Sequence, residues 1–198
     1  KKIIFNGNGY DEQWIEEATK QRGLLNYRTT PDCMPHLLDP KNVEMLTAHK
    51  VFSKAELESR CEIMLDNYCK TVIIEANTMV EMAKTEIAPA IEAYCAELAE
   101  TAAAKKALAA DLPCHYELDL LRTLSACTDA IAVHTAELSD IVKELDQTKD
   151  IVEEANKIRD DVLGKMEQLR AVCDKAETMT AKKYWPFPTY GDLLFSVK

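Results

Sequence analysis

Glycine and long apolar runs are both scarce in this sequence. The 198 residues include 5 glycines, and no apolar run approaches the ~20 residues that a membrane-spanning helix needs. The N-terminal residues lack the long apolar region and the small-residue cleavage site of a secretory signal peptide. We therefore predict a cytoplasmic chain that does not enter a membrane.

Basic residues are also in short supply relative to acidic ones. The chain has 24 lysines and arginines against 34 aspartates and glutamates, a formal net charge of −10. Nucleic acids and anionic membrane surfaces carry dense negative charge, so a protein that binds them needs a basic face. The charge balance therefore argues against nucleic acid and membrane as partners.

The residue patterns of common catalytic and metal sites are missing as well. The histidines are scattered, and no two lie four residues apart as in a metal-binding helical pair. The chain has no Gly-x-x-x-x-Gly-Lys-Ser/Thr sequence, which excludes a phosphate-binding loop of that kind. We therefore assign no catalytic, cofactor-binding or metal-ligating residue. The histidines are His36, His49, His115 and His134.

The seven cysteines are an odd number, and no two form a Cys-x-x-Cys pair. A zinc site would need closely spaced ligand pairs, and these are missing. Most of the cysteines fall on apolar faces of predicted helices, so we predict buried free thiols in a reducing cytosol. They are Cys33, Cys61, Cys69, Cys95, Cys114, Cys127 and Cys173.

The pattern of residues 1–52 predicts short helices and loops, with three of the five glycines. The apolar run at 3–5 is predicted to be a strand or an extended segment. Asp11 is placed to cap a helix that continues to about Arg22 and stops at Gly23. Two further helical segments are expected, at 32–38 and 40–49.

Residues 53–182 change to the pattern of long helices. Ser53 and Glu56 form a capping box before a periodic run that extends to about Ala110. The mean spacing of its apolar stripe, near 3.7 residues, is closer to an eleven-residue repeat than to a heptad. We expect Pro89 to kink this helix or to break it into two. The predicted stripe is Leu57, Cys61, Met64, Tyr68, Val72, Ala76, Met79, Ala83, Ile87, Ala90, Tyr94 and Leu98.

Two more long helices are predicted, at about 114–145 and 150–182. Apolar positions in the first alternate in steps of three and four, as in the seam of a coiled-coil-like pair. Gly164 in the second marks either a close helix crossing or a weak point. The two stripes are Leu121, Leu124, Thr128, Ile131, Thr135, Leu138, Val142 and Leu145, and Ile151, Ala155, Ile158, Val162, Met166, Leu169, Cys173 and Ala176.

Residues 183–198 are rich in aromatic residues and prolines. Because proline stops a helix and favours extended backbone, Pro186 and Pro188 predict an extended strap. A strap this apolar needs cover, so it docks either on its own helices or on another domain or subunit. We expect a groove between long helices to take Trp185, Phe187 and Tyr190, and burial further along for Leu193, Leu194 and Phe195.

These patterns together predict a mainly α fold. The long helices should fold back on one another as an antiparallel bundle or hairpin with coiled-coil-like seams. A small N-terminal segment of short helices and loops precedes them, and an extended aromatic C-terminal tail follows. The predicted domains are 1–52, 53–182 and 183–198.

Several stretches of the chain resemble the type III glutamine synthetases, a large bacterial form of the enzyme. The most specific stretch is the C-terminal string KYWPFPTYGDLLF at 183–195. The stretch 29–37 resembles a motif of the family in which Met34 takes the place of the usual leucine. The other stretches are 3–14, 22–24 and 57–68. The resemblance runs through the chain in order and implies that it corresponds to the C-terminal region of a longer protein.

The resemblance implies an activity for the parent enzyme. That enzyme would be a glutamate–ammonia ligase that makes glutamine with ATP and a divalent metal, Mg or Mn. Metal ions in such reactions neutralise charge on the transferring phosphoryl group. The family's metal and phosphate ligands belong to the catalytic domain upstream, and residues 1–52 would be the end of that domain. We therefore expect no catalytic site and no cofactor in this chain by itself.

Two roles remain open for the chain. The first is structural and oligomer-stabilising, with the rest of the synthetase chain and neighbouring subunits of a homo-oligomer as partners. The alternative is a regulatory helical module that binds a ligand or a partner protein. The C-terminal string argues against a third possibility, a free-standing coiled-coil protein unrelated to synthetases.

Overall fold

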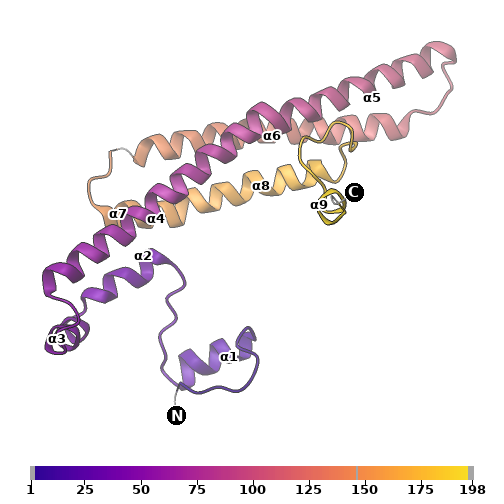
Figure 1. The fold of residues 1–198 in the computed structure, drawn as a ribbon. Coiled ribbons are helices and arrows are strands. Elements are labelled where there is room, and N and C mark those ends of the chain that lie inside the picture. The colour runs from indigo at the N-terminus through magenta and orange to yellow at the C-terminus, as the bar shows by residue number, and fades with distance from the viewer. Residues whose placement is uncertain (1–2, 146, 196–198) are drawn as a thin grey trace. The chain divides into compact units, whose positions relative to one another are not determined.

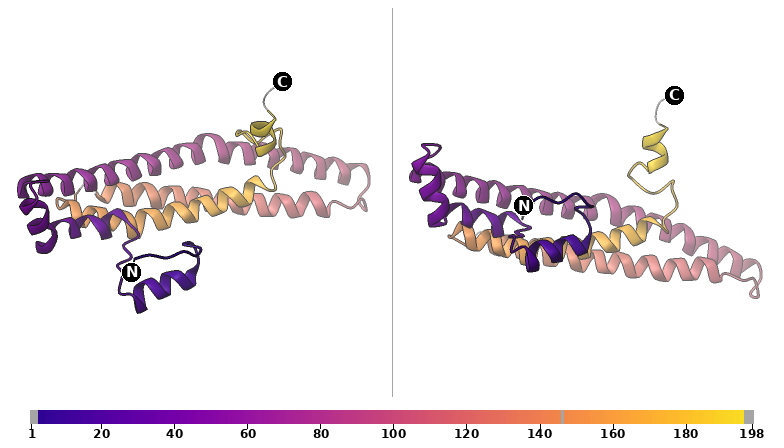
Figure 2. Two further views of the ribbon diagram at one scale, coloured as in Figure 1. Left: turned by 60° about the horizontal axis from the view of Figure 1, so that its bottom comes forward. Right: turned by 90° about the horizontal axis from the view of Figure 1, so that it is seen from below.

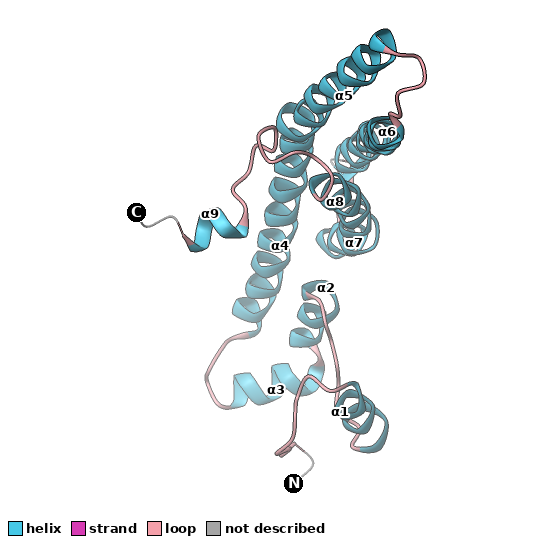
Figure 3. Cartoon of the chain, turned by 90° about the vertical axis from the view of Figure 1, so that its right-hand side faces the viewer, coloured by secondary structure: helices cyan, strands magenta, loops and turns pink. Residues whose placement is uncertain are grey.

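The computed structural model describes residues 3–145 and 147–195, and the regular elements within these ranges are all helices (Figure 3). This confirms the predicted mainly α fold. The chain divides into two compact units, Lys1–Asp66 and Asn67–Lys198, and the boundary falls inside a long helix. The predicted division into 1–52, 53–182 and 183–198 stays a prediction. Within the described ranges, no helix combines the length and the apolar character needed to span a bilayer.

The first unit begins with α1 (Glu12–Glu16), which continues into a π-helical turn (Glu17–Gln21). The Asp11 carboxylate accepts a hydrogen bond from the Gln13 N–H at 3.0 Å and so caps the start of the helix. Gly23 ends it with φ +66°, a conformation that favours glycine. Both the start and the stop of this helix were predicted correctly.

Residues 3–5 form an irregular segment that side-chain stacking holds in place. The Phe5 ring stacks on the Trp14 ring with centroids 3.9 Å apart. The Arg22 guanidinium lies 4.7 Å from the Trp14 centroid and donates a hydrogen bond to the Ile4 carbonyl at 2.9 Å. Of the two predicted alternatives, the strand is therefore excluded for this segment.

Three further helical segments follow in the first unit. They are α2 (Thr30–Cys33), a 3₁₀ turn (Met34–Leu38) and α3 (Pro40–Ala48), close to the predicted 32–38 and 40–49. The long helix α4 (Lys54–Met82) then starts at the predicted capping box. The Ser53 N–H donates to the Glu56 carboxylate at 2.7 Å, and the Glu56 N–H donates to Ser53 Oγ at 3.3 Å.

Pro89 does not break the long helix. A π-helical turn (Ala83–Ile87) joins α4 directly to α5 (Ala88–Leu108). In this turn the Ala88 N–H donates to the Ala83 carbonyl, which lies five residues earlier, whereas an α-helix would use the carbonyl four residues earlier. The wider turn shifts the hydrogen-bond ladder by one residue just before the proline, which has no N–H to contribute. Helix therefore runs through residues 54–108 as one element.

The buried stripe of the long helix is displaced by one residue from the predicted one at three positions, two in α4 and one in α5, where Ile91 is fully buried in place of the predicted Ala90. Leu65 and Cys69 are each 1% exposed, whereas the predicted Met64 is 49% exposed. Tyr68, the other predicted position, is half-buried. A step of three residues and a step of four residues both stay on the same helix face. The spacing therefore could not tell which of two adjacent apolar residues, such as Met64 and Leu65, would be buried.

The second unit is built from long helices that lie side by side (Figures 1 and 2). Helix α6 (His115–Leu145) packs against both α5 and α8 (Leu163–Glu177). Helix α7 (Ile151–Lys157) leads into α8 through another π-helical turn (Ile158–Val162). The largest fully buried side chains of this core include Ile91, Leu124, Ile131, Leu138, Ile158 and Leu169.

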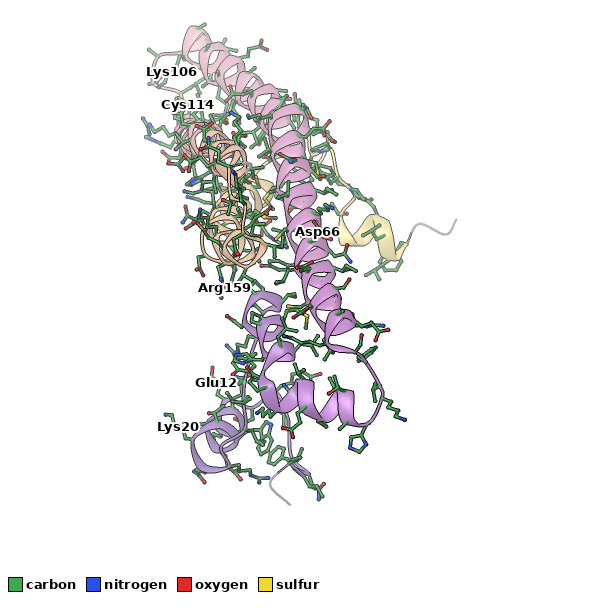
Figure 4. The ribbon with its side chains drawn as sticks, turned by 90° about the vertical axis from the view of Figure 1, so that its left-hand side faces the viewer. Glu12, Lys20, Asp66, Lys106, Cys114 and Arg159 are labelled. Carbon is green, nitrogen blue, oxygen red and sulfur yellow. The ribbon has the colours of Figure 1, made fainter. Side chains whose placement is uncertain are left out.

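Lysine side chains close the turn between α5 and α6. The Lys106 ammonium donates to the Ala110 and Leu112 carbonyls at 3.0 and 2.9 Å. The Lys105 ammonium pairs with the Glu117 carboxylate, which is buried at the start of α6 and has its pKa lowered by that hydrogen bond. Figure 4 shows Lys106 and Cys114 at this same end of the helix pair.

All seven cysteines are free thiols, as predicted. Six of them are buried, which also agrees with the prediction. Cys33, at the end of α2, is the exception because its side chain is exposed.

We predict that Gly164→Ala stabilises the chain. A Cβ built at Gly164 meets no atom within 4 Å, so the glycine marks a weak point in α8 and not a close helix crossing. Alanine in a helix interior is favoured over glycine by about 0.5–1 kcal/mol. Urea unfolding followed by helical circular dichroism should show the gain, and Gly23→Ala should show a loss because of its positive φ. Lower stability of Gly164→Ala would contradict this account.

Candidate functional site

The C-terminal strap, whose described part is residues 181–195, follows a short turn after α8 ends at Glu177. The predicted helix extended further, to about Lys182. The chain leaves the helix early because Thr180 closes it: its N–H and its hydroxyl both donate to the Ala176 carbonyl, at 2.9 and 2.8 Å. The strap then crosses to α5.

Contacts with α5 anchor the first part of the strap. The Tyr184 hydroxyl donates to the Glu97 carboxylate at 2.5 Å, and the Lys183 ammonium pairs with the same carboxylate. The Tyr184 ring also packs against the Tyr94 ring with centroids 5.6 Å apart. This part of the strap therefore docks on its own helices, one of the two alternatives that the sequence left open.

Beyond Tyr184 the strap covers an apolar groove between α4 and α8. Trp185 and Phe187 meet edge to face, with ring centroids 6.3 Å apart, and both line a cavity of about 550 Å³. The groove was predicted for these two side chains; the side chain of Tyr190 lies outside the described part. We call this cavity the strap groove. It is lined by Ile74, Glu75, Thr78, Met79, Met82, Ala83, Ile87, Met166, Arg170, Cys173, Asp174, Glu177, Trp185 and Phe187.

The wall of the strap groove is rich in sulfur. Met79, Met82 and Met166 line it together with Cys173. Burial, and then the nearby Asp174 carboxylate, raises the pKa of the Cys173 thiol to about 11, so the thiol stays protonated at neutral pH. Methionine side chains are flexible and polarizable, and they adapt to ligands of different shape. The wall is therefore suited to binding an apolar group and not to nucleophilic chemistry.

Charged residues form the rim of the strap groove. Arg170 pairs with Asp174 one turn along α8, with Nε and Oδ2 3.3 Å apart. Glu75 on α4 and Glu177 on α8 have no side-chain hydrogen bond or ion pair within the described residues. Spacing in the sequence did not predict that Glu75 and Glu177, about a hundred residues apart, would line the same groove.

The last part of the strap is helical, where an extended tail was predicted. Thr189 and Asp192 form a capping box at the start of α9 (Tyr190–Leu194), and Asp192 also pairs with Lys182 at 2.8 Å. The Thr-x-x-Asp spacing was visible in the sequence and could have predicted this turn. The predicted burial of three side chains was wrong: Leu193, Leu194 and Phe195 are 60%, 73% and 80% exposed.

The histidines that the sequence analysis set aside have local partners in two cases. His36 stacks on the Tyr27 ring at 4.2 Å and lies 3.0 Å from the Asp39 carboxylate. His134 lies 3.3 Å from the Glu137 carboxylate. Across residues 3–145 and 147–195, no three His, Cys, Asp or Glu side chains are grouped as metal ligands.

We predict that acid releases the strap. Hydrogen bonds from Lys183 and Tyr184 lower the pKa of Glu97 below its ordinary 4.5, and those from Lys182 and Thr189 lower the pKa of Asp192 below its ordinary 3.8. A carboxylate whose pKa is lower in the folded state than in the unfolded state stabilises the fold fully at pH values above its ordinary pKa. This stabilisation is lost as the pH falls through the lowered pKa of the folded state.

The measurement is Trp185 fluorescence in a Trp14→Phe chain, which leaves one tryptophan. The emission should stay constant from neutral pH down to the ordinary carboxyl range and change only below it. Glu97→Gln should remove much of this pH dependence. An emission change centred near neutral pH would contradict the assignment to these carboxylates.

Comparison with known proteins identifies related sequences. The family profile described as "Glutamine synthetase C-terminal domain" matches residues 1–106. A "Glutamine synthetase" of Butyrivibrio fibrisolvens is 36% identical over 198 residues, which is 100% of this chain and 28% of the relative. A "Type-3 glutamine synthetase" of Dictyostelium discoideum is 30% identical over 202 residues, 98% of this chain and 27% of the relative.

A third relative, a "Glutamine synthetase" of Bacteroides fragilis, is 28% identical over 200 residues, 98% of this chain and 27% of the relative. The chain therefore spans 27–28% of the length of these relatives. The profile covers more than half of the chain, and the alignments extend through the strap. The chain belongs to the glutamine synthetase family, and it corresponds to the C-terminal region of the type III enzymes.

Proposed function

We propose that the chain is a structural domain of a type III glutamine synthetase and stabilises its assembly. Its partners are the rest of the synthetase chain and neighbouring subunits of a homo-oligomer. In this proposal the parent enzyme is a cytoplasmic ligase that makes glutamine from glutamate and ammonia, with ATP and Mg or Mn. The names of the relatives support the activity, and the surface of this chain supports the structural role.

The observation that carries the structural role is the exposed apolar end of α9. Leu194 and Phe195 stand next to each other and are 73% and 80% exposed. Contiguous apolar residues on a surface are typical of a contact with another protein surface. The relatives are several times longer than this chain, so their remaining length is a source of such a surface.

The conformation of α9 supports the same conclusion. A single helical turn is not stable by itself in water, because ordering its backbone costs more than its few hydrogen bonds return. Here the Thr189–Asp192 capping box and the Lys182–Asp192 ion pair hold the turn in place. The chain thus presents its apolar end in a preformed conformation, which lowers the entropic cost of docking.

The test is a double substitution in the full-length synthetase, Leu194→Asp with Phe195→Asp. Mass photometry should show the oligomer dissociating into smaller species, and glutamine formation should fall with it. The same substitutions should leave the melting temperature of the 198-residue chain unchanged, because both side chains are exposed there. The control is Thr101→Asp, which adds a charge at an exposed position of α5. An oligomer and an activity equal to wild type would refute the proposal.

A further inference from the structure

We propose that the methionines of the strap groove form a modification site, at which a hydroperoxide oxidises their thioethers to sulfoxides and thereby displaces residues 185–187 of the strap. The methionines are Met79 and Met82 from α4 and Met166 from α8. The inference concerns the strap and its own helices, so it does not depend on the structural role proposed above. It gives the regulatory alternative a chemical trigger.

Methionine is concentrated in the strap groove. The chain has seven methionines, and three of them line this cavity. Two lie on α4 and the third on α8, more than eighty positions further along the chain. Trp185 and Phe187 of the strap line the same cavity. Oxidation of any of the three sulfurs therefore changes the surface that the strap covers.

A small oxidant can enter the strap groove. The groove has an open volume of about 550 Å³, and hydrogen peroxide is only slightly larger than a water molecule. Met79, Met82 and Met166 are all half-buried, so none of the three side chains is fully enclosed by the core. The groove therefore combines apolar packing with access for a peroxide.

The thiol in the same wall does not compete for the oxidant. A cysteine reacts with a peroxide as its thiolate. Burial raises the pKa of the Cys173 thiol to about 11, so almost none of it is ionised at neutral pH. A thioether has no proton to lose, and its reaction does not need a prior ionisation. We therefore expect the methionines to be modified and Cys173 to stay reduced.

The oxidation transfers one oxygen atom. The O–O bond of the hydroperoxide breaks, an S–O bond forms, and an alcohol leaves, or water when the oxidant is hydrogen peroxide. The sulfur loses two electrons and the peroxide gains them. Sulfoxide formation turns a flexible apolar side chain into a polar one and disrupts methionine-rich contacts.

The polar product disfavours the closed strap. A sulfoxide oxygen under the strap lacks the hydrogen bonds that water would provide, which destabilises the covered state. Moving Trp185 and Phe187 aside lets water reach the oxygen. The hydrogen bond from Tyr184 to Glu97 on α5 lies outside the groove lining, so the strap stays attached there. The displaced part is therefore residues 185–187.

The experiment treats the 198-residue chain, in the Trp14→Phe background, with hydrogen peroxide. Peptide mass spectrometry measures oxidation at each methionine, and Trp185 fluorescence follows the strap. The emission should shift to longer wavelength in step with oxidation of the groove methionines, towards that of the urea-unfolded chain. Methionine sulfoxide reductases with dithiothreitol should reverse the shift. Dithiothreitol alone should not, because it reduces oxidised thiols and not sulfoxides.

Substitutions then assign the effect to the groove. Combined Met79→Leu, Met82→Leu and Met166→Leu substitutions nearly conserve volume and remove the thioethers. Peroxide should then leave the emission unchanged. The matched control combines Met45→Leu with Met64→Leu, at positions that are 50% and 49% exposed and do not line the groove. The control chain should respond to peroxide as its parent does.

Three results would overturn the proposal. One is an unchanged Trp185 emission when mass spectrometry shows the groove methionines oxidised. Another is oxidation of Met45 and Met64 while the groove methionines stay intact. The third is an equal shift in the chain with the three leucine substitutions. Where a variant fails to fold, the single leucine substitutions and the oxidation kinetics of the unmodified chain decide the same questions.

Discussion

Leu138→Ala should destabilise the Asn67–Lys198 unit by about 3 kcal/mol, as expected when a buried leucine is truncated in a well-packed core. Leu138 is fully buried on α6, the helix that packs against both α5 and α8. Truncation there leaves a cavity that rigid neighbouring helices fill only in part. A loss of this size should lower the melting temperature by roughly 6–12 °C in a chain of this length.

The measurement is thermal unfolding followed by helical circular dichroism on the 198-residue chain. The matched control is Val133→Ala on the same helix, whose side chain is 53% exposed. It should change the melting temperature little, because most of its surface already contacts water. Equal effects of the two substitutions would contradict the packing of α6 described above.

Trp185→Ala should be the second most destabilising change, by about 2–3 kcal/mol. Truncating a fully buried tryptophan lowers the free energy of unfolding by about 3–5 kcal/mol. Trp185 is only half-buried, so we expect a smaller decrease. The substitution removes the contact with Phe187 and one side of the strap groove. One effect partly offsets this decrease. Trp185 Nε1 is buried without a hydrogen-bond partner in the described structure, which destabilises the fold, and the substitution removes this unsatisfied donor.

The control for Trp185→Ala lies in the same strap. Phe195→Ala removes an aromatic side chain that is 80% exposed and should leave the stability of the 198-residue chain unchanged. In full-length synthetase the order should reverse for assembly, because Phe195 belongs to the proposed docking surface. If Trp185→Ala spares the 198-residue chain, the strap does not depend on its own helices for cover.

Much of the helical core could be predicted from the sequence. In α6 the predicted Leu124, Ile131, Thr135, Leu138 and Leu145 are all buried. Apolar residues that recur every three or four positions, with polar residues between them, lie on one face of a helix. That face is then the one that packs into the core. Where both neighbours were apolar, as at Met64 and Leu65, the pattern did not distinguish them.

The strap shows where prediction from sequence reached its limit. The prolines and aromatics predicted that it leaves the bundle and that Trp185 and Phe187 enter a groove. They did not predict that Glu97 on α5 anchors it, because that contact joins residues more than eighty positions apart. Burial of Leu194 and Phe195 was predicted from their apolar character alone, and apolar character does not specify which protein surface provides the cover.

The sequence by itself determined the helical class, the caps at Asp11 and Ser53, and the apolar faces of α6 and α8, because these follow from local periodicity and capping chemistry. Its resemblance to type III glutamine synthetases also identified the family. Only the tertiary structure decided how a π-helical turn carries the long helix past Pro89, and which side chains line the strap groove. Those features depend on distant segments meeting in space, and local sequence carries no record of that meeting.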